Sequence, residues 1–304
     1  MRLWVPYDDA VERMGGVPDG VHVDVYDGVA DPPSTVDEVE FYVVPYMASS
    51  LRPLELMASM PSLKVAQTLT AGVDNFLPFV PDGVTLCNAR GVHDASTAEL
   101  AVTLVLSSLR GIPEFVRAQE RGEWATERRT SLADRTVLIV GYGSVGAAVE
   151  HRLEGFECEV LRVARRARDG VSDMSELPGL LSRADVVVLT VPMTAETDGL
   201  VDAKFLAAMP DGSLLVNVAR GPVVRTDALL AELESGRLRA ALDVTDPEPL
   251  PPGHPLWQAP GLLLSPHVGG NSTAFLPRAM RLVGEQVRRY CAGDELANVI
   301  NGDY

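Results

Sequence analysis

A short aliphatic run, TVLIV at residues 136–140, leads directly into the glycine-rich segment GYGSVG at 141–146. The residues that follow, AAVEHRLEGF, have a helical pattern, so the segment is expected to connect a strand to a helix. The first glycine would permit a tight turn, the second would let the backbone approach a pyrophosphate, and the third would let the helix pack against the strand. The sequence therefore predicts an α/β fold with a dinucleotide site at Gly141, Gly143, Ser144, Val145 and Gly146.

The end of the next expected strand indicates which dinucleotide binds. NAD sites carry an Asp or Glu about 20 residues beyond the glycines, where it binds the ribose 2′-hydroxyl. That position falls on Ala164 here, and Arg165 and Arg166 follow it. A carboxylate would repel a 2′-phosphate, whereas guanidinium groups bind one. The alternative is an ordinary solvated basic loop; in a chain of net charge −16 we favour NADP(H), with NAD(H) as a second cofactor.

Short β-rich runs alternate with helical stretches on both sides of this segment, a pattern that predicts βαβ units and parallel sheets. The expected strands are Arg2–Pro6, Val21–Tyr26, Phe41–Pro45, Leu63–Thr68, Val84–Cys87, Thr136–Val140, Glu159–Val163, Val186–Val191, Leu214–Val218, Ala240–Val244 and Leu262–Ser265. An amphipathic helix over 274–292 is expected to return to the first sheet. We therefore expect residues 93–272 to form a domain inserted into a first domain made of 1–92 and 273–304.

The segment STAELAVTLVLSSL at 96–109 predicts a helix that is apolar nearly all round. Ser96 or Thr97 is the expected N-cap, with Glu99 completing a capping box. A helix of this kind must be buried on most sides, between domains or between subunits. Because one sheet covers only part of such a surface, we expect a homodimer.

Three polar residues each lie just beyond an expected strand: Arg220, Glu248 and His267. In open α/β sheets ligands bind outside the carboxyl ends of the strands, so these side chains are expected to converge. Arginine suits a carboxylate and a carbonyl, and histidine can donate a proton to a new alkoxide near neutral pH. A carboxylate beside the imidazole would orient it and raise its pKa. This set indicates reduction of a 2-oxo acid by hydride transfer.

Together these motifs resemble the D-2-hydroxyacid dehydrogenase family over nearly the whole chain. The matching segments are AGVDN at 71–75, STAEL at 96–100, GYGSVG at 141–146, VPMTAETDGL at 191–200, NVARGPVV at 217–224, LDVTDPEPL at 242–250, HPLW at 254–257 and SPHVGG at 265–270. The resemblance implies two Rossmann-like domains with parallel sheets, a flavodoxin-like substrate domain and an NAD(P)-binding domain.

The resemblance also implies a role for each matching residue. Arg220 would bind substrate, Glu248 would be the partner of the histidine, and His267 would be the acid/base. Asp243 would hold the nicotinamide carboxamide, and backbone amides of Ala71, Gly72 and Val73 would hold the substrate carboxylate. The remaining expected contacts are Thr97, Val191, Pro192, Thr197 and Ala219 for the cofactor, and Tyr46 and Met47 near the substrate.

Several related activities have to be weighed. Formate dehydrogenases carry glutamine where this chain has Glu248, and phosphite dehydrogenases carry lysine where it has Ala71, so both are disfavoured. Phosphoglycerate dehydrogenases frequently carry a carboxy-terminal regulatory domain, whereas this sequence stops soon after its last expected helix. Glyoxylate or hydroxypyruvate reduction fits better, since many such members carry arginines after the second strand. Two alternatives stay open: a phosphoglycerate-dehydrogenase-like enzyme without the regulatory domain and, from a different class, a nucleotide-sensing corepressor of the same fold.

Composition excludes several partners. A net charge of −16 disfavours nucleic acid and anionic membrane surfaces. Cys87, Cys158 and Cys291 are scattered, which fits a reducing cytoplasm better than a disulfide framework, and no metal site is assigned. The amino terminus has no apolar h-region and no run is long enough to span a membrane, so we expect a cytoplasmic enzyme with a small 2-oxo or 2-hydroxy acid as partner.

Overall fold

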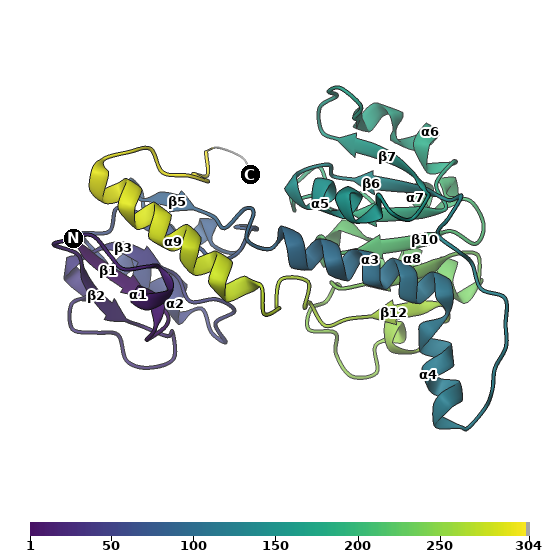
Figure 1. Cartoon of the computed structure of the whole chain (residues 1–304), viewed down its shortest axis with the longest axis horizontal. Coiled ribbons are helices and arrows are strands. Elements are labelled where there is room, and N and C mark those ends of the chain that lie inside the picture. The colour runs from purple at the N-terminus through teal and green to yellow at the C-terminus, as the bar shows by residue number, and fades with distance from the viewer. Residues whose placement is uncertain (302–304) are drawn as a thin grey trace. The chain divides into compact units, whose positions relative to one another are not determined.

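The computed structural model describes residues 1–301 of the chain and divides it into two compact units (Figure 1). Unit 1 consists of Met1–His93 together with the segment that begins at Thr273, and unit 2 consists of Asp94–Ser272. Unit 2 is thus an insertion in the sequence of unit 1. Each unit has its own parallel sheet, which confirms the predicted α/β fold class with two Rossmann-like sheets.

The sheet of unit 1 has five strands in the order β2-β1-β3-β4-β5, and all neighbouring pairs are parallel. This is the strand order of flavodoxin-like folds. Side chains alternate between the two faces: Leu3 and Phe41 belong to one apolar cluster, and Trp4 and Tyr42 to the other. The strands are β1 (Arg2–Val5), β2 (His22–Val25), β3 (Val39–Val43), β4 (Val65–Gln67) and β5 (Thr85–Cys87).

The long helix α9 (Phe275–Ala292) covers one face of this sheet (Figure 1). Its buried side chains, Phe275, Ala279, Met280, Val283 and Val287, recur at helical spacing and join the cluster of Leu3 and Phe41. The other helical elements of unit 1 are α1 (Ala10–Arg13), η1 (Val36–Glu38), α2 (Arg52–Glu55), η2 (Leu56–Ser59) and η3 (Leu77–Phe79).

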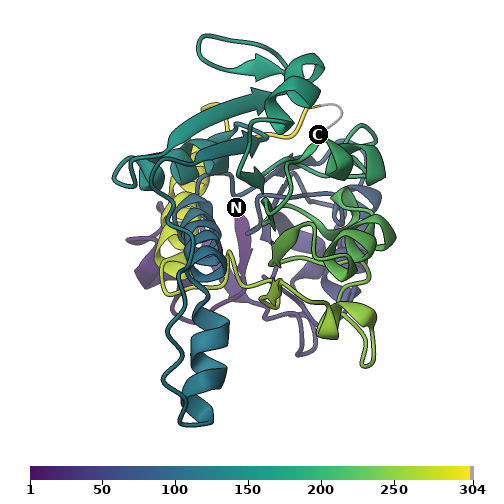
Figure 2. The same cartoon turned by 90° about the vertical axis from the view of Figure 1, so that its right-hand side faces the viewer.

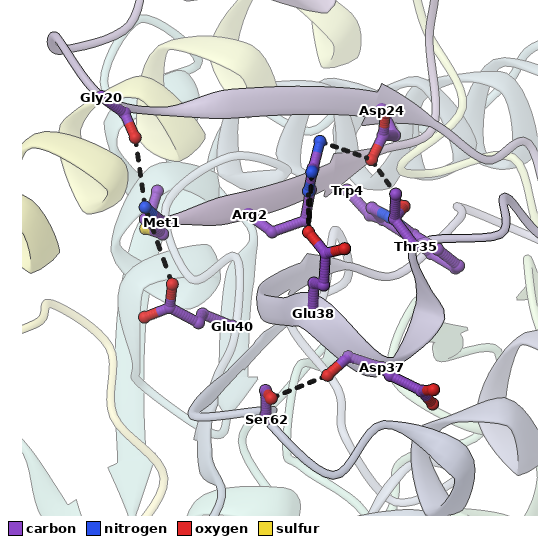
Figure 3. Close-up of polar contacts among 10 residues, drawn as sticks. All are labelled: Met1, Arg2, Trp4, Gly20, Asp24, Thr35, Asp37, Glu38, Glu40 and Ser62. Atoms are coloured by element: carbon purple, nitrogen blue, oxygen red, sulfur yellow. Dashed lines mark hydrogen bonds and ion pairs between the residues drawn. The ribbon is translucent and has the colours of Figure 1, made fainter.

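Polar contacts around β1 connect the loops of unit 1 (Figure 3). Arg2 donates to Glu38 at 2.7 Å and lies 3.4 Å from Asp24. Thr35 accepts a hydrogen bond from the Trp4 indole at 3.2 Å and donates to Asp24 at 2.7 Å. The indole of a fully buried tryptophan is thereby satisfied, so β1 can carry this large side chain into the core.

The sheet of unit 2 has seven strands in the order β12-β11-β10-β9-β6-β7-β8, again all parallel. The order is that of the doubly wound dinucleotide-binding fold with one further strand. The central strands β9 and β10 are buried at every residue, as expected for a sheet covered on both faces. The strands are β6 (Thr136–Val140), β7 (Glu159–Ala164), β8 (Ser172–Asp173), β9 (Val186–Leu189), β10 (Leu214–Asn217), β11 (Arg239–Leu242) and β12 (Leu262–Leu264).

Helices cover both faces of this sheet. Side chains of α3 (Asp94–Arg110) and α5 (Ser144–Leu153) belong to one apolar cluster, and those of α6 (Leu177–Leu181), α7 (Ala203–Ala208) and α8 (Thr226–Glu234) belong to the other. Helix α3 begins at Asp94, so Ser96, Thr97 and Glu99 lie inside it and the expected capping box is wrong. The short helices η4 (Met174–Glu176), η5 (Gly221–Val223) and η6 (Pro255–Gln258) lie in the connections.

Helix α4 (Ile112–Glu120) projects away from the rest of unit 2 in both views (Figures 1 and 2). Gly111 has φ +66° and separates α4 from α3, a left-handed conformation that favours glycine. Ile112 and Val116 on α4 are about half exposed, and Trp124 beyond it is 94% exposed. Sequence reasoning predicted no element here. Within residues 1–301, no helix combines the length and apolar character needed to cross a membrane.

Candidate active site

The glycine-rich loop connects β6 to α5 at the carboxyl edge of the unit 2 sheet. Gly141 has φ +101°, and a Cβ placed on it would lie 2.5 Å from the Val191 nitrogen. A Cβ on Gly146 would lie 2.9 Å from the Gly141 carbonyl oxygen and 3.1 Å from Ile139 Cγ2. Both glycines are therefore required by close packing: one against the chain after β9, the other between helix and strand.

Gly143 differs from these two glycines, because a Cβ on it would meet no atom within 4 Å. It is the N-cap residue of α5 and offers no side chain to cap the helix. The first amides of α5, at Ser144 and Val145, have no intrahelical acceptor. Open space beside uncapped amides at a helix N-terminus suits a pyrophosphate, so the residues present fit a dinucleotide.

The residues after β7 fit a phosphorylated ribose. Ala164, at the end of β7, carries no carboxylate, and Arg165 and Arg166 beyond it are exposed. Arg165 lies near Glu196: the pKa of Glu196 is lowered, first by a hydrogen bond with Thr194 and further by the charge of Arg165. The arginines therefore lie next to the position that an acidic residue occupies in NAD sites.

The connection after β9 borders the glycine-rich loop. Thr190 donates a hydrogen bond to the Gly141 carbonyl oxygen at 2.8 Å, a contact that sequence reasoning missed. Thr197 donates to the Pro192 carbonyl oxygen at 2.6 Å and accepts from the Thr194 amide at 2.8 Å. Its hydroxyl thus holds the turn that contains Val191 and Pro192, both expected cofactor contacts.

Arg220 follows β10 and is positioned by a buried asparagine. Asn217 is fully buried; its side-chain amide donates to the Arg220 carbonyl oxygen at 2.9 Å, and its side-chain oxygen accepts from the Ala219 amide at 3.0 Å. The Arg220 guanidinium donates to the Ala219 carbonyl oxygen at 2.8 Å. The turn that carries the expected substrate-binding arginine is therefore built around Asn217, which sequence reasoning had not singled out.

Glu248 and His267 are brought together from two connections. His267 follows β12 with φ +51°, a left-handed conformation that is uncommon for a residue with a side chain. Its Nδ1 forms a short hydrogen bond with Glu248 Oε1. Both side chains are partly exposed. The pairing leaves His267 Nε2 as the ring nitrogen available to a substrate.

Charges around the pair favour its ionised form. The pKa of His267 is raised, first by the hydrogen bond with Glu248 and also by the negative charge of Glu248. Burial of the imidazole and the positive charge of Arg220 oppose this shift. The pKa of Glu248 is lowered: burial acts to raise it, but the hydrogen bond and charge of His267, the Thr245 amide and Arg220 together outweigh burial. The pair therefore holds a proton on the imidazole to a higher pH than a free histidine would.

Asp243 is 3% exposed and anchors the connection that carries His267. Its Oδ1 accepts hydrogen bonds from the Ser265 hydroxyl at 2.6 Å and the Val268 amide at 2.9 Å, and its Oδ2 accepts from the Gly269 amide at 2.8 Å. The family resemblance assigned this carboxylate to the nicotinamide. The structure shows that it also fixes the backbone on both sides of His267.

Thr97, another expected cofactor contact, lies beside this anchor. A Cβ placed on Gly269 would lie 2.9 Å from Asp243 Oδ2 and 3.5 Å from the Thr97 side chain. Thr97 thus approaches the His267 connection from α3, whereas the tight contact that a glycine at position 269 allows is the one with the Asp243 carboxylate.

In unit 1, the loop Ala71–Val73 follows β4 at the carboxyl edge of its own sheet. Asn88 donates to the Ala71 carbonyl oxygen at 2.7 Å, and Thr70 donates to the Gly72 carbonyl oxygen at 2.7 Å. Two carbonyl groups of the loop are thus occupied by side chains of the same unit. This fixes the direction of the peptide groups expected to bind a carboxylate.

Tyr46 and Met47 follow β3 at the same edge of unit 1. The Tyr46 ring packs against Phe275 at 4.1 Å and against His93 at 5.7 Å between centroids. Met47 is 59% exposed with φ +49°. Tyr46 is therefore held in an aromatic stack, whereas Met47 presents its side chain to solvent.

Comparison with known proteins bears on the family to which the chain belongs. A sequence model described as the NAD binding domain of D-isomer specific 2-hydroxyacid dehydrogenases matches residues 102–269. A glyoxylate reductase of Thermofilum pendens is 31% identical over 264 residues, which cover 81% of this chain and 77% of that protein.

Two solved structures are similar over nearly their whole length. A D-isomer specific 2-hydroxyacid dehydrogenase of Xanthobacter autotrophicus, in complex with NADPH and MES, is 31% identical with a TM-score of 0.82, covering 99% of this chain and 97% of that one. An NADPH-dependent glyoxylate/hydroxypyruvate reductase of Sinorhizobium meliloti, in complex with NADP and sulfate, is 26% identical with a TM-score of 0.84, covering 99% and 98%. The resemblance seen in the sequence motifs is confirmed: the chain belongs to the D-isomer specific 2-hydroxyacid dehydrogenase family and is an NAD(P)-dependent oxidoreductase.

Proposed function

We propose that this enzyme reduces a small 2-oxo acid of the glyoxylate or hydroxypyruvate kind to the D-2-hydroxy acid, with NADPH as the preferred reductant. The observation that carries the proposal is the hydrogen-bonded His267–Glu248 pair, close enough to Arg220 for its charge to act on both. The pair lies at the same edge of the unit 2 sheet as the open space beside Gly143.

The chemistry assigns a separate task to each side chain. NADPH, when bound, supplies a hydride to the carbonyl carbon of the substrate. His267 Nε2 donates the proton that the resulting alkoxide oxygen requires, and Glu248 holds the imidazolium through Nδ1. Arg220 binds the carboxylate and polarises the carbonyl oxygen. The products are the 2-hydroxy acid, the oxidised cofactor and a neutral His267, which is reprotonated from solvent.

The cofactor preference rests on the residues that follow β7. Neither Arg165 nor Arg166 forms an ion pair with any residue in the described part of the chain, so both guanidinium groups are available to a 2′-phosphate. Two structural relatives are complexes with NADPH or NADP. Without a carboxylate at Ala164 the site does not repel the phosphate, and we assign NADP(H) as the main cofactor and NAD(H) as the weaker one.

Within unit 1, we assign the substrate carboxylate to the backbone amides of Ala71, Gly72 and Val73. The hydrogen bonds of Asn88 and Thr70 to the carbonyl groups of this loop support the assignment, because they fix the orientation of the peptide planes. Tyr46 and Met47 are the proposed neighbours of the substrate side chain.

The test is turnover of the purified protein with a panel of 2-oxo acids, each with NADPH and with NADH. We expect the highest kcat/KM with NADPH and a short substrate such as glyoxylate or hydroxypyruvate. The His267→Ala variant should bind NADPH like the wild type but lose most of the turnover. Binding of NADPH without turnover of any acid would instead indicate a nucleotide sensor and refute the proposed reaction.

We also propose a homodimer in a reducing cytoplasm. Most apolar residues of α3 pack inside unit 2, so we place the surface that a partner would cover at the junction of α3 and α4. Leu106 of α3 and Ile112 and Phe115 of α4 line an open cavity of about 310 Å³ there, and Val116 of α4 and Trp124 beyond it are exposed. A second copy of the chain is the proposed occupant. Light scattering at micromolar concentration tests this, and a stable monomer would contradict it.

The proposal of a reducing cytoplasm is supported by the cysteines. Cys87, Cys158 and Cys291 are free thiols, the form that a reducing compartment maintains.

A further inference from the structure

The arginine cluster after β7 contains a third member, Arg168, whose surroundings differ from those of Arg165 and Arg166. Its guanidinium donates a hydrogen bond to the Tyr142 carbonyl oxygen and lies 5.5 Å above the centre of the Tyr142 ring. Tyr142 is the second residue of the glycine-rich loop. Arg168 therefore connects the arginine segment to the loop expected to hold the pyrophosphate.

Tyr142 is held from the other end of its side chain as well. Its phenol donates a short hydrogen bond to Glu150 of α5, and Arg162 of β7 donates to the same carboxylate, at 2.8 Å from its Nε. The Arg162 guanidinium also lies 5.8 Å above the centre of the Tyr142 ring. The pKa of Glu150 is lowered, first by its hydrogen bond with Arg162, so this carboxylate is ionised at neutral pH.

The turn that contains Arg168 is itself fixed. The Arg168 amide donates to the Val171 carbonyl oxygen at 3.0 Å, and the Val171 amide donates back at 2.8 Å. Gly170, with φ +68°, allows this turn, and its carbonyl oxygen lies 3.5 Å from an Arg162 nitrogen that donates to it. Arg168 thus reaches Tyr142 from a closed two-residue turn.

Fixing the loop matters because two of its first three residues are glycines. Glycine loses more conformational freedom on ordering than any other residue, and this cost falls on ligand binding when the loop is mobile without ligand. The amides of Gly141 and Tyr142 both donate to the Val163 carbonyl oxygen, and Thr190 donates to the Gly141 carbonyl oxygen. Arg168 supplies the matching contact at the Tyr142 carbonyl oxygen, directly before Gly143.

We propose that Arg168 is a positioning residue for the dinucleotide: it holds the glycine-rich loop through the Tyr142 carbonyl and ring, and so prepares the loop for NADPH and NADH alike. The inference rests on the dinucleotide site of the proposed function. It divides the arginine cluster into two parts. Arg165 and Arg166 select the 2′-phosphate, whereas Arg168 acts on the part of the cofactor that both dinucleotides share.

The experiment measures the Kd of NADPH and of NADH by calorimetric titration. For Arg168→Ala we expect Kd to rise on the order of 10-fold for both cofactors, as when a hydrogen bond from a charged group is lost. Arg168→Lys keeps a charged donor and should recover part of the affinity. Tyr142→Phe, which removes only the bond to Glu150, should weaken both cofactors to a smaller and again equal extent.

The matched control is Arg183→Ala. Arg183 is an exposed arginine of the same unit, paired with Glu159 at 3.1 Å, and its removal changes the net charge equally. Its Kd values should match the wild type. Hydrogen–deuterium exchange of the cofactor-free protein gives a second readout: amides of 141–146 and 165–171 should exchange faster in Arg168→Ala than in the control.

Three results would overturn the inference. A loss of affinity confined to NADPH would show that Arg168 binds the 2′-phosphate directly. Unchanged Kd values with an unchanged Tm would show that its contact with Tyr142 has no effect on binding. Unchanged Kd values with a lower Tm would show that the contact only stabilises the fold. Failure of the wild type to bind either cofactor is a different result, which would refute the proposed function itself.

Discussion

Gly221→Ala tests how the structure brings Glu248 to His267. A Cβ at position 221 would lie 1.9 Å from the Thr245 carbonyl oxygen and 2.2 Å from its carbon. Ordinary contact begins at 3.4 Å, so one of the two backbone segments must move by the difference, 1.5 Å. The two Thr245 atoms belong to the backbone, so they cannot move away by a side-chain rotation. The amide of the same residue donates a hydrogen bond to Glu248 Oε2 at 3.4 Å. The displacement therefore reaches the partner of His267.

The expected magnitudes follow from this displacement. Overpacking of a buried contact costs about 1–3 kcal/mol. Because unit 2 has the size at which 1 kcal/mol shifts Tm by roughly 2–4 °C, a decrease of about 2–12 °C is expected. Misplacement of a catalytic group by about 1 Å can cost on the order of 100-fold in turnover. We expect kcat to fall by that order while the Kd of NADPH stays near the wild-type value.

The assay is steady-state reduction of glyoxylate with NADPH, combined with thermal unfolding and titration of NADPH. Gly179→Ala in α6 is the control: the same atom is added, but no neighbour lies within 4 Å, so kcat and Tm should not fall. A Gly221→Ala enzyme with the kcat and Tm of the wild type would refute the reasoning, since it would show that the approach to Thr245 is not needed.

Four further predictions address the site. His267→Ala should lower turnover by about 10²–10⁴-fold with unchanged NADPH affinity; Glu248→Gln removes the charge that raises the pKa of His267, so the fall of the reduction rate with rising pH should move to lower pH. A pH–rate profile of each variant checks both, and an unmoved profile would exclude Glu248 as the partner. Neutral replacement of Arg165 and Arg166 together should weaken NADPH binding by up to a few kcal/mol and NADH binding little; equal losses would make them structural. Gly143→Ala should leave Tm unchanged, since no atom lies within 4 Å of the added Cβ, but should raise the Kd of both cofactors. Unchanged Kd values would show that the pyrophosphate does not bind in the space beside Gly143.

All strands except β8 could be predicted from local patterns, because a buried parallel strand is a short aliphatic run between turn signals. β8 was missed because it consists of only two polar residues, Ser172 and Asp173. The residues at which the strands end could not be predicted in the same way. Val186–Val191 was expected and β9 ends at Leu189, since the following residues leave the ladder to pack on Gly141. Helix α4 was missed altogether: its apolar residues are largely exposed, so they do not form the pattern of a helix covered by its own domain.

The residues expected at the site are placed by contacts of long sequence separation. Glu248 and His267 were recognised from their motifs, and the structure joins them by a hydrogen bond. The roles of Asn217 and Gly221 were missed because neither carries reactive chemistry; each matters only through the backbone that it approaches. For Asp243 the family resemblance predicted a role at the nicotinamide, but its three hydrogen bonds to the His267 connection could not be predicted from the sequence.

By itself, the sequence determined the fold class, the dinucleotide loop and the candidates for the reacting groups, because these depend on residue type and on spacing along a few consecutive residues. Only the tertiary structure decided which of the three arginines after β7 is engaged with the loop, and which two form no hydrogen bond with it in the described part of the chain. In the sequence the three are equivalent basic residues. They differ because Arg168 alone reaches Tyr142, a residue 26 positions away that parallel pairing of β6 with β7 brings alongside.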